Sequence, residues 1–259
     1  MTTFTVPGAD LDVEFSDEHG WPVVQLHGLT SSRSRDRTLG LDLGRGLSGT
    51  RLLRYDARAH GRSTGRPEPR DHRWPVLADD LLRLLDSWFP GERVHGVGPS
   101  MGTGTLLHAA VLDPGRFSGL TLVIPPTAWD SRPAMAEMYR AAADTVETEG
   151  IDAFIDAGRT APRPPALAGT RETVPAVAAD LLPSVLRGAA LSDLPSPAHV
   201  AAIDVPTSIL AWTDDAGHPL STAEALVDLL PHATLTVART PAEMALWPSL
   251  LHQQVAERR

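Results

Sequence analysis

Short apolar runs alternate with amphipathic segments along the first half of the chain. Helices are predicted for residues 76–89, whose apolar positions recur at helical spacing up to a Pro-Gly stop, and for residues 103–112. Strands are predicted at five runs, residues 11–15, 22–26, 51–55, 94–97 and 120–124. Strands and helices in alternation predict an α/β fold, with a mostly parallel central sheet flanked by helices.

The chain changes character between residues 127 and 204, which are rich in alanine and proline and contain no convincing strand. Helical patches are predicted there at residues 133–148, 172–187 and 196–202. The strand–helix pattern then resumes, with strands at residues 207–212 and 234–238 and helices at residues 221–230 and 241–258. We therefore expect a core made of residues 1–126 and 205–259, and a helical insertion, residues 127–204, that forms a cap or lid.

Composition narrows the classes of function. The net charge of −9 argues against a nucleic-acid partner, and the absence of cysteine excludes a disulfide, a thiol nucleophile and a thiolate metal site. No apolar stretch approaches the ~20 residues of a membrane helix, and no secretory signal opens the chain, so a cytoplasmic protein without a membrane partner is expected. One cluster of arginines is interpreted as a solvated strand edge: Arg51, Arg54, Arg58 and Arg62.

The segment Gly98-Pro99-Ser100-Met101-Gly102 lies between a predicted strand and a predicted helix. A glycine two places either side of a serine allows the sharp turn that exposes a nucleophilic hydroxyl. The N–H of Met101, at the start of the helix, is a candidate donor to an oxyanion. The alternative is an ordinary glycine-rich turn in which Ser100 caps the helix.

These features resemble the α/β-hydrolase superfamily. Four segments carry the resemblance, in the family's order: residues 26–30, 55–63, 98–102 and 209–219. The first is similar to the His-Gly loop that supplies a second oxyanion donor, which the resemblance places at the N–H of Leu29. The second is similar to an Asp-x-Arg-Gly-His-Gly-x-Ser loop, with Ala59 in place of a glycine. The insertion also falls where this family has its cap.

The family order is serine, acid, histidine, with the acid after the strand that ends at Trp212. The resemblance favours Asp215 as the acid over its neighbour Asp214, although both aspartates also suit a turn. Asp130 is a further possibility, since some hydrolases of this fold carry the acid after an earlier strand. Its more ordinary role is to cap a helix.

The triad histidine is absent from its usual place, the loop after the last strand. Residues 238–244 contain no histidine, and Thr240 to Glu243 form a capping box instead. His218 is the best candidate, because it lies at the carboxyl end of a central strand, where open α/β sheets have their ligand-binding and active sites. Its spacing of three residues from Asp215 is short for a straight hydrogen bond, and it also suits the start of the next helix. His27 and His60 are interpreted as residues that hold loops in place.

The sequence thus predicts a serine hydrolase that cleaves an ester, lactone or related acyl bond of a small, partly apolar substrate through an acyl-enzyme. The predicted machinery consists of Ser100, His218 and Asp215 with the amides of Leu29 and Met101, and needs no metal or cofactor. One alternative is a non-hydrolytic enzyme of the same fold that performs C–C cleavage, cyclisation or decarboxylation. Another is an inactive homologue that binds a small molecule. The oligomeric state is left open.

Overall fold

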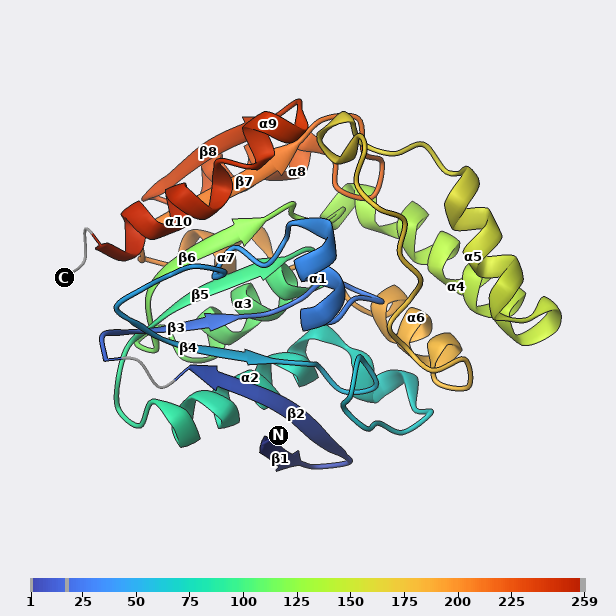
Figure 1. The fold of residues 1–259 in the computed structure, drawn as a ribbon, viewed down its shortest axis with the longest axis horizontal. Helices are drawn as coiled ribbons and strands as arrows, with labels where there is room; N and C mark the ends of the chain where they lie inside the picture. Colours follow the sequence, from blue (N-terminus) through green and yellow to red (C-terminus); the bar gives the residue numbers. More distant parts are fainter. Residues whose placement is uncertain (1, 17–18, 257–259) are drawn as a thin grey trace.

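A computed structural model describes residues 2–16 and 19–256 of the protein and contains an eight-stranded sheet in the order β1-β2-β4-β3-β5-β6-β7-β8 (Figure 1). The strands β1 and β2 pair antiparallel, and β2 pairs antiparallel with β4, while all later neighbours are parallel. The mostly parallel sheet is therefore confirmed. The strands are β1 (Thr2–Val6), β2 (Ala9–Ser16), β3 (Trp21–Gln25), β4 (Thr50–Tyr55), β5 (Val94–Pro99), β6 (Phe117–Val123), β7 (Thr207–Trp212) and β8 (Ala233–Ala238).

Helices cover both faces of the sheet, as Figure 1 shows. One face is covered by α2 (Trp74–Trp88), α3 (Met101–Leu112), α7 (Pro197–Ala201) and α8 (Leu220–Leu229), which form one apolar core with the strands. The other face is covered by α1 (Arg33–Leu39), α9 (Pro241–Met244) and α10 (Trp247–Ala256), around a second core. The helix predicted for residues 241–258 is in fact two helices, and its last two residues lie outside the described part of the chain.

The segment between β6 and α7 is helical and stands at one end of the sheet (Figure 1). It contains α4 (Arg132–Glu149), α5 (Ile151–Thr160) and α6 (Leu182–Ala190), with α4 packed against both others and an apolar cluster of its own. The helix predicted for residues 172–187 is wrong in its first half. Residues 161–181, here called the strap, run between α5 and α6 without an α-helix, since Ala176 bonds to the backbone of Thr30 and Gly61 and Val177 forms a β-bridge with His60.

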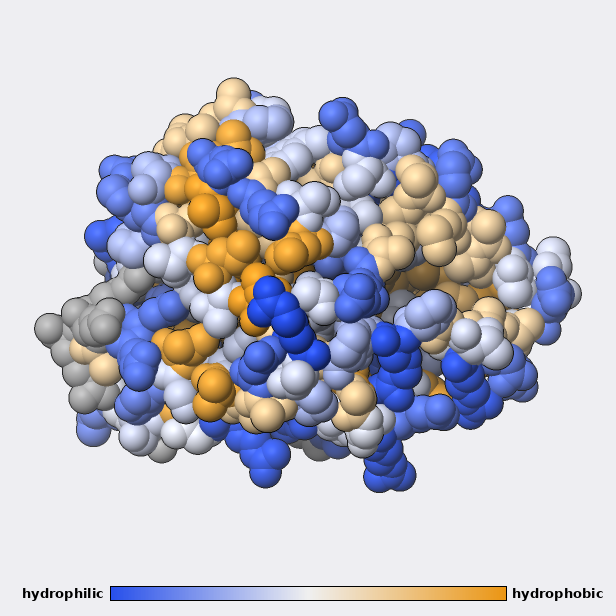
Figure 2. All heavy atoms as spheres, turned by 90° about the horizontal axis from the view of Figure 1, so that it is seen from above, coloured by the Kyte–Doolittle hydropathy of each residue, from blue (hydrophilic) through white to orange (hydrophobic). Residues whose placement is uncertain are grey.

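The surface on the side of the edge strand β8 is shown in Figure 2, where polar residues are interrupted by apolar ones over β8 and the helices beside it. This open edge lies away from α4 and α5. No helix of residues 2–16 and 19–256 combines the length and the apolar character that crossing a membrane requires.

Candidate active site

Ser100 occupies a sharp turn between β5 and α3. Its backbone has φ 51° and ψ −108°, a conformation that non-glycine residues rarely adopt, and its N–H donates to the carbonyl of Val123 at 2.9 Å. A Cβ on Gly98 would lie 2.6 Å from the backbone carbon of Gly102, so the close crossing before and after the serine requires glycine. The strained turn presents the hydroxyl at the carboxyl edge of the sheet.

His218 and Asp215 extend a hydrogen-bonded chain from the serine. The Oγ of Ser100 lies 2.8 Å from Nε2 of His218, and Nδ1 of His218 lies 2.8 Å from Oδ2 of Asp215. A proton on Nδ1 is donated to the carboxylate, which leaves Nε2 to accept from the serine hydroxyl. The structure thus brings together the three residues that the sequence proposed, in the arrangement of a Ser-His-Asp triad.

Asp215 is held as a carboxylate by the donors around it. Burial alone would raise its pKa, but hydrogen bonding to His218 and the attraction of that imidazole lower it, and the pKa of Asp215 falls to about 2. The N–H of Gly217 donates to Oδ1 at 2.8 Å, and the indole Nε1 of Trp212 donates to Oδ2 at 2.8 Å. The carboxylate therefore stays charged at neutral pH, as an orienting acid must.

The other acids considered from the sequence lie apart from this chain of bonds. Asp214 is exposed, with φ 59°, and serves the turn that follows β7. Asp130 is also exposed, in a short 3-10 turn before α4. The loop after β8 forms half of the predicted capping box: Oγ1 of Thr240 accepts from the N–H of Glu243 at 3.2 Å, but the Glu243 carboxylate accepts from the N–H of Arg239 instead of that of Thr240.

Two backbone N–H groups flank the serine. The loop that carries Leu29 lies against the turn at Ser100. A Cβ on Gly28 would be 3.8 Å from Cβ of Ser100. Among residues 2–16 and 19–256, the N–H groups of Leu29 and Met101 donate to no other protein group. Both predicted oxyanion donors are therefore free to bind a ligand oxygen.

His27 and His60 lie outside this hydrogen-bonded chain and hold residues 26–30, here called the oxyanion loop because it carries the proposed donor Leu29. Nε2 of His27 accepts from the N–H of Ala57 at 2.9 Å, while Nε2 of His60 accepts from the N–H of Thr30 at 3.2 Å. Each ring donates through Nδ1 to a backbone carbonyl. Burial lowers the pKa of both residues, that of His60 to about 3, so both rings are neutral acceptors at physiological pH.

Two further residues, Thr127 and Trp212, hold Asp215 and His218 in place. The N–H of Thr127 donates to the carbonyl of Gly217 at 3.1 Å, which ties the loop of Asp215 to the end of β6. Trp212 donates to Asp215, meets the ring of His218 edge-on at 6.0 Å and stacks on Trp247 at 6.3 Å. The position of Trp212, last in the strand before the acid, is the signal that could have identified it.

We expect Trp212→Phe to lower kcat by about tenfold, because the change removes one donor to the Asp215 carboxylate while an aromatic ring still packs in its place. Trp247→Phe is the matched control. The Trp247 indole is buried against Trp212, but its N–H has no hydrogen-bond partner among the described residues. Steady-state kinetics on both variants check this, and equal losses in the two would contradict a role for the Trp212 N–H.

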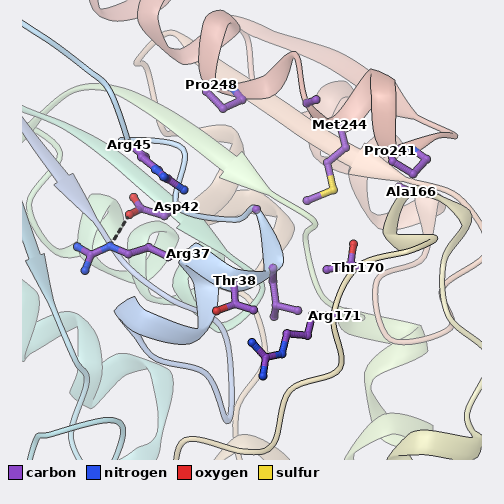
Figure 3. A pocket seen from close by; sticks show the side chains of 13 residues that line it. Arg37, Thr38, Asp42, Arg45, Ala166, Thr170, Arg171, Pro241, Met244 and Pro248 are labelled. Carbon is purple, nitrogen blue, oxygen red and sulfur yellow. Dashed lines mark hydrogen bonds and ion pairs between the residues drawn. The ribbon is translucent and has the colours of Figure 1, made fainter.

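A cavity of about 440 Å³ lies between α1 and α9, beside the loop where the family has its histidine (Figure 3). Pro241 and Met244 line it from that loop and helix, and Arg37 on the opposite wall is directed at Asp42, with 3.0 Å between Nε and Oδ2. In the part of the chain that the structure describes, no group of three or more His, Asp or Glu side chains is placed to hold a metal ion.

Comparisons with known proteins agree with the fold. The family model of the alpha/beta hydrolase fold matches residues 22–147. An esterase from Thermogutta terrifontis, in a malate-bound structure, is 23% identical with a TM-score of 0.75, over 99% of this chain and 95% of that chain. The enol-lactonase of Burkholderia xenovorans LB400 is 22% identical with a TM-score of 0.77, over 99% of both chains. No curated protein sequence matches significantly.

The sequence match lies in the first part of the chain, whereas the structural likeness extends over almost all of it. The sheet order, the strained turn at Ser100 and the placement of the acid loop after β7 agree with that likeness. The protein therefore has the α/β-hydrolase fold, and residues 22–147 match the model of that family.

Proposed function

We propose that the protein is a serine hydrolase that cleaves an ester, lactone or related acyl bond of a small, partly apolar substrate. The observation that carries the proposal is the hydrogen-bonded chain from Oγ of Ser100 through His218 to Asp215, with 2.8 Å at each step. The family match over residues 22–147, and structural neighbours described as an esterase and an enol-lactonase, support the same class of reaction.

In the proposed reaction, Nε2 of His218 takes the hydroxyl proton as Oγ of Ser100 attacks the acyl carbon. The carbonyl oxygen becomes an oxyanion that accepts from the N–H groups of Leu29 and Met101. When the bond to the leaving oxygen breaks, that oxygen takes the proton from His218 and an acyl-enzyme remains. Water then attacks the acyl carbon, gives its proton to His218 and releases the acid, while His218 returns the proton to Ser100.

The segment between residues 127 and 204 is proposed as the cap over this site. The methyl carbon of Met135 in α4 would lie 3.9 Å from a Cβ on Gly217, and Thr127 donates to the same residue. The strap meets the oxyanion loop, since the N–H of Ala176 donates to the carbonyl of Thr30 at 2.8 Å. An acyl group at Ser100 would therefore lie near Met135 of α4 and near the strap.

Labelling with a fluorophosphonate probe tests the proposal, because such a probe forms a bond only to an activated serine. We expect stoichiometric labelling at Ser100, located by peptide mass spectrometry, and its loss in Ser100→Ala. The variant should keep the circular dichroism and melting temperature of the unchanged protein. A folded protein that does not label would contradict the hydrolase and favour a non-hydrolytic enzyme or a ligand-binding protein.

A further inference from the structure

A second cavity, of about 290 Å³, lies on the oxyanion side of the triad and is here called the Arg35 cavity. Thr30, which directly follows the proposed oxyanion donor Leu29, forms part of its wall. The remaining wall comes from α1, α5 and the strap, and includes Arg35, Leu39, Phe154, Leu167 and Thr173. Its volume is at the low end of the roughly 300–1,000 Å³ of small-molecule sites.

Arg35 differs from the arginines on either side of it in α1. Arg33 forms ion pairs with Asp12 and Asp56, and Arg37 forms ion pairs with Glu14 and Asp42. Among the residues that the structure describes, none offers Arg35 a carboxylate at ion-pair distance; it donates only to neutral oxygens. A half-buried guanidinium without a counter-ion is costly unless a ligand supplies the charge.

The guanidinium of Arg35 also has N–H donors that bind no other protein group in the described residues. Nε donates to Oγ1 of Thr173 at 2.8 Å, and Nη1 donates to the carbonyl of Thr30 at 2.9 Å and to its Oγ1 at 3.2 Å. Nη2 donates to no other protein group within residues 2–16 and 19–256. The free N–H groups are those that a carboxylate or phosphate oxygen would accept from.

The charges around the cavity favour an anion. Arg159 and Arg163 line it together with Arg35, against a single lining acid, Glu172. Arg159 is neutralised by Asp156 at 2.8 Å and lies 3.8 Å from Glu172, so the positive charge left over is that of Arg35 and Arg163. Burial lowers the pKa of Arg35, and its neighbour Asp36 raises it. Asp36 compensates only in part, because burial raises its own pKa to about 7. This excess of positive charge stands out in a chain whose net charge is −9.

We propose that the substrate carries a small oxyanion, a carboxylate or a phosphate, that binds Arg35 in this cavity while its acyl carbon lies at Ser100. This inference rests on the proposed function and names the substrate more closely: an acyl compound with an acidic end rather than a neutral ester. Thr30 gives the spatial link, since it binds Arg35 through two oxygens and lies next to the proposed oxyanion donor Leu29. Arg35 is then the residue that selects the substrate.

The test compares esters that differ only in the charged end. The probes are the mono-p-nitrophenyl esters of adipic and suberic acid, each beside its neutral terminal amide. We expect the unchanged protein to favour the acid over the amide in kcat/KM, and Arg35→Gln to reduce that preference at least about tenfold, as the loss of a charge-assisted hydrogen bond should. Arg35→Lys, which keeps the charge, should retain part of the preference. Arg37→Gln, a control on the same helix, should leave it within about twofold.

The ratio of kcat/KM for the acid to kcat/KM for the amide distinguishes recognition of the charged end from a purely structural role of Arg35. If Arg35 only ties the strap to Thr30, Arg35→Gln will slow both esters equally and leave their ratio unchanged, and that result would overturn the proposal. Equal rates for acid and amide in the unchanged protein would overturn it as well. Calorimetric titration with adipate and with hexyl phosphate shows which oxyanion binds and does not depend on turnover. A protein that binds one of them through Arg35 but fails to label at Ser100 would refute the proposed hydrolase and leave the anion site intact.

Discussion

Replacing His218 with alanine should lower kcat for ester hydrolysis by about 10³-fold, because the change removes the general base in contact with Ser100. The fold should survive, since the side chain is 23% exposed and, among the residues that the structure describes, its ring nitrogens bind only Ser100 and Asp215. Single-turnover rates of p-nitrophenyl acetate cleavage measure the effect. Added imidazole should restore part of the rate, because the missing side chain leaves space beside Oγ of Ser100.

His199→Ala is the control for this experiment. His199 lies in α7, where Nδ1 pairs with the hydroxyl of Ser196 at 2.8 Å, and its removal should change kcat less than about twofold. A loss of only a few-fold in His218→Ala would mean that the proton leaves Ser100 by another route. It would contradict the proposed mechanism even if Ser100 labels as expected.

The sheet and the serine turn were accessible from the sequence because local signals determine both. Apolar runs that end at polar or glycine-rich turns located β3 to β8 to within a few residues. The glycines around Ser100 indicated that the backbone before and after the serine passes close together. In the structure, a Cβ on Gly98 would lie only 2.6 Å from the backbone carbon of Gly102. By contrast β1, α1 and α5 were not predicted. In α5, for example, every residue is at least partly exposed, so its stability depends on neighbours that a local pattern does not reveal.

Long-range pairing explains the interpretations that were wrong. Arg58 was expected at a solvated edge, yet it is 2% exposed and forms two hydrogen bonds of 2.7 Å with Asp80 in α2. Arg54 is likewise buried and pairs with Asp42. An arginine is buried where a carboxylate from another element meets it, and the sequence around it does not contain that partner.

The contact between His218 and Asp215 shows the same limit at the site. Three residues seemed a short spacing for a straight hydrogen bond, but Nδ1 and Oδ2 are 2.8 Å apart. Two features make this possible: Asp214 takes φ 59°, and the carboxylate of Asp215 accepts from the N–H of Gly217, which closes the turn. Both are backbone properties of a short loop, and residue types alone did not specify them.

Asp215→Asn should lower kcat by about 10³- to 10⁴-fold, comparable to the loss of the acid in other triads. Three donors converge on the carboxylate: Trp212 and His218 on Oδ2, and the N–H of Gly217 on Oδ1. An amide with its oxygen toward His218 would direct its NH2 group at the Gly217 donor. In the other orientation the NH2 group meets Nδ1 of His218 and favours the proton on Nε2, where the ring can no longer accept from Ser100.

Asp214→Asn is the control that the chain itself provides, one residue away. Asp214 is exposed and lies in the left-handed region at φ 59°, a conformation that asparagine also adopts readily, so kcat should change less than about twofold. Steady-state kinetics near neutral pH compare the two variants, since the pKa of about 2 keeps Asp215 ionised there. Comparable losses in both would assign the effect to the turn rather than to the charge. A large loss confined to Asp215→Asn would show that turnover needs the Asp215 carboxylate to orient His218.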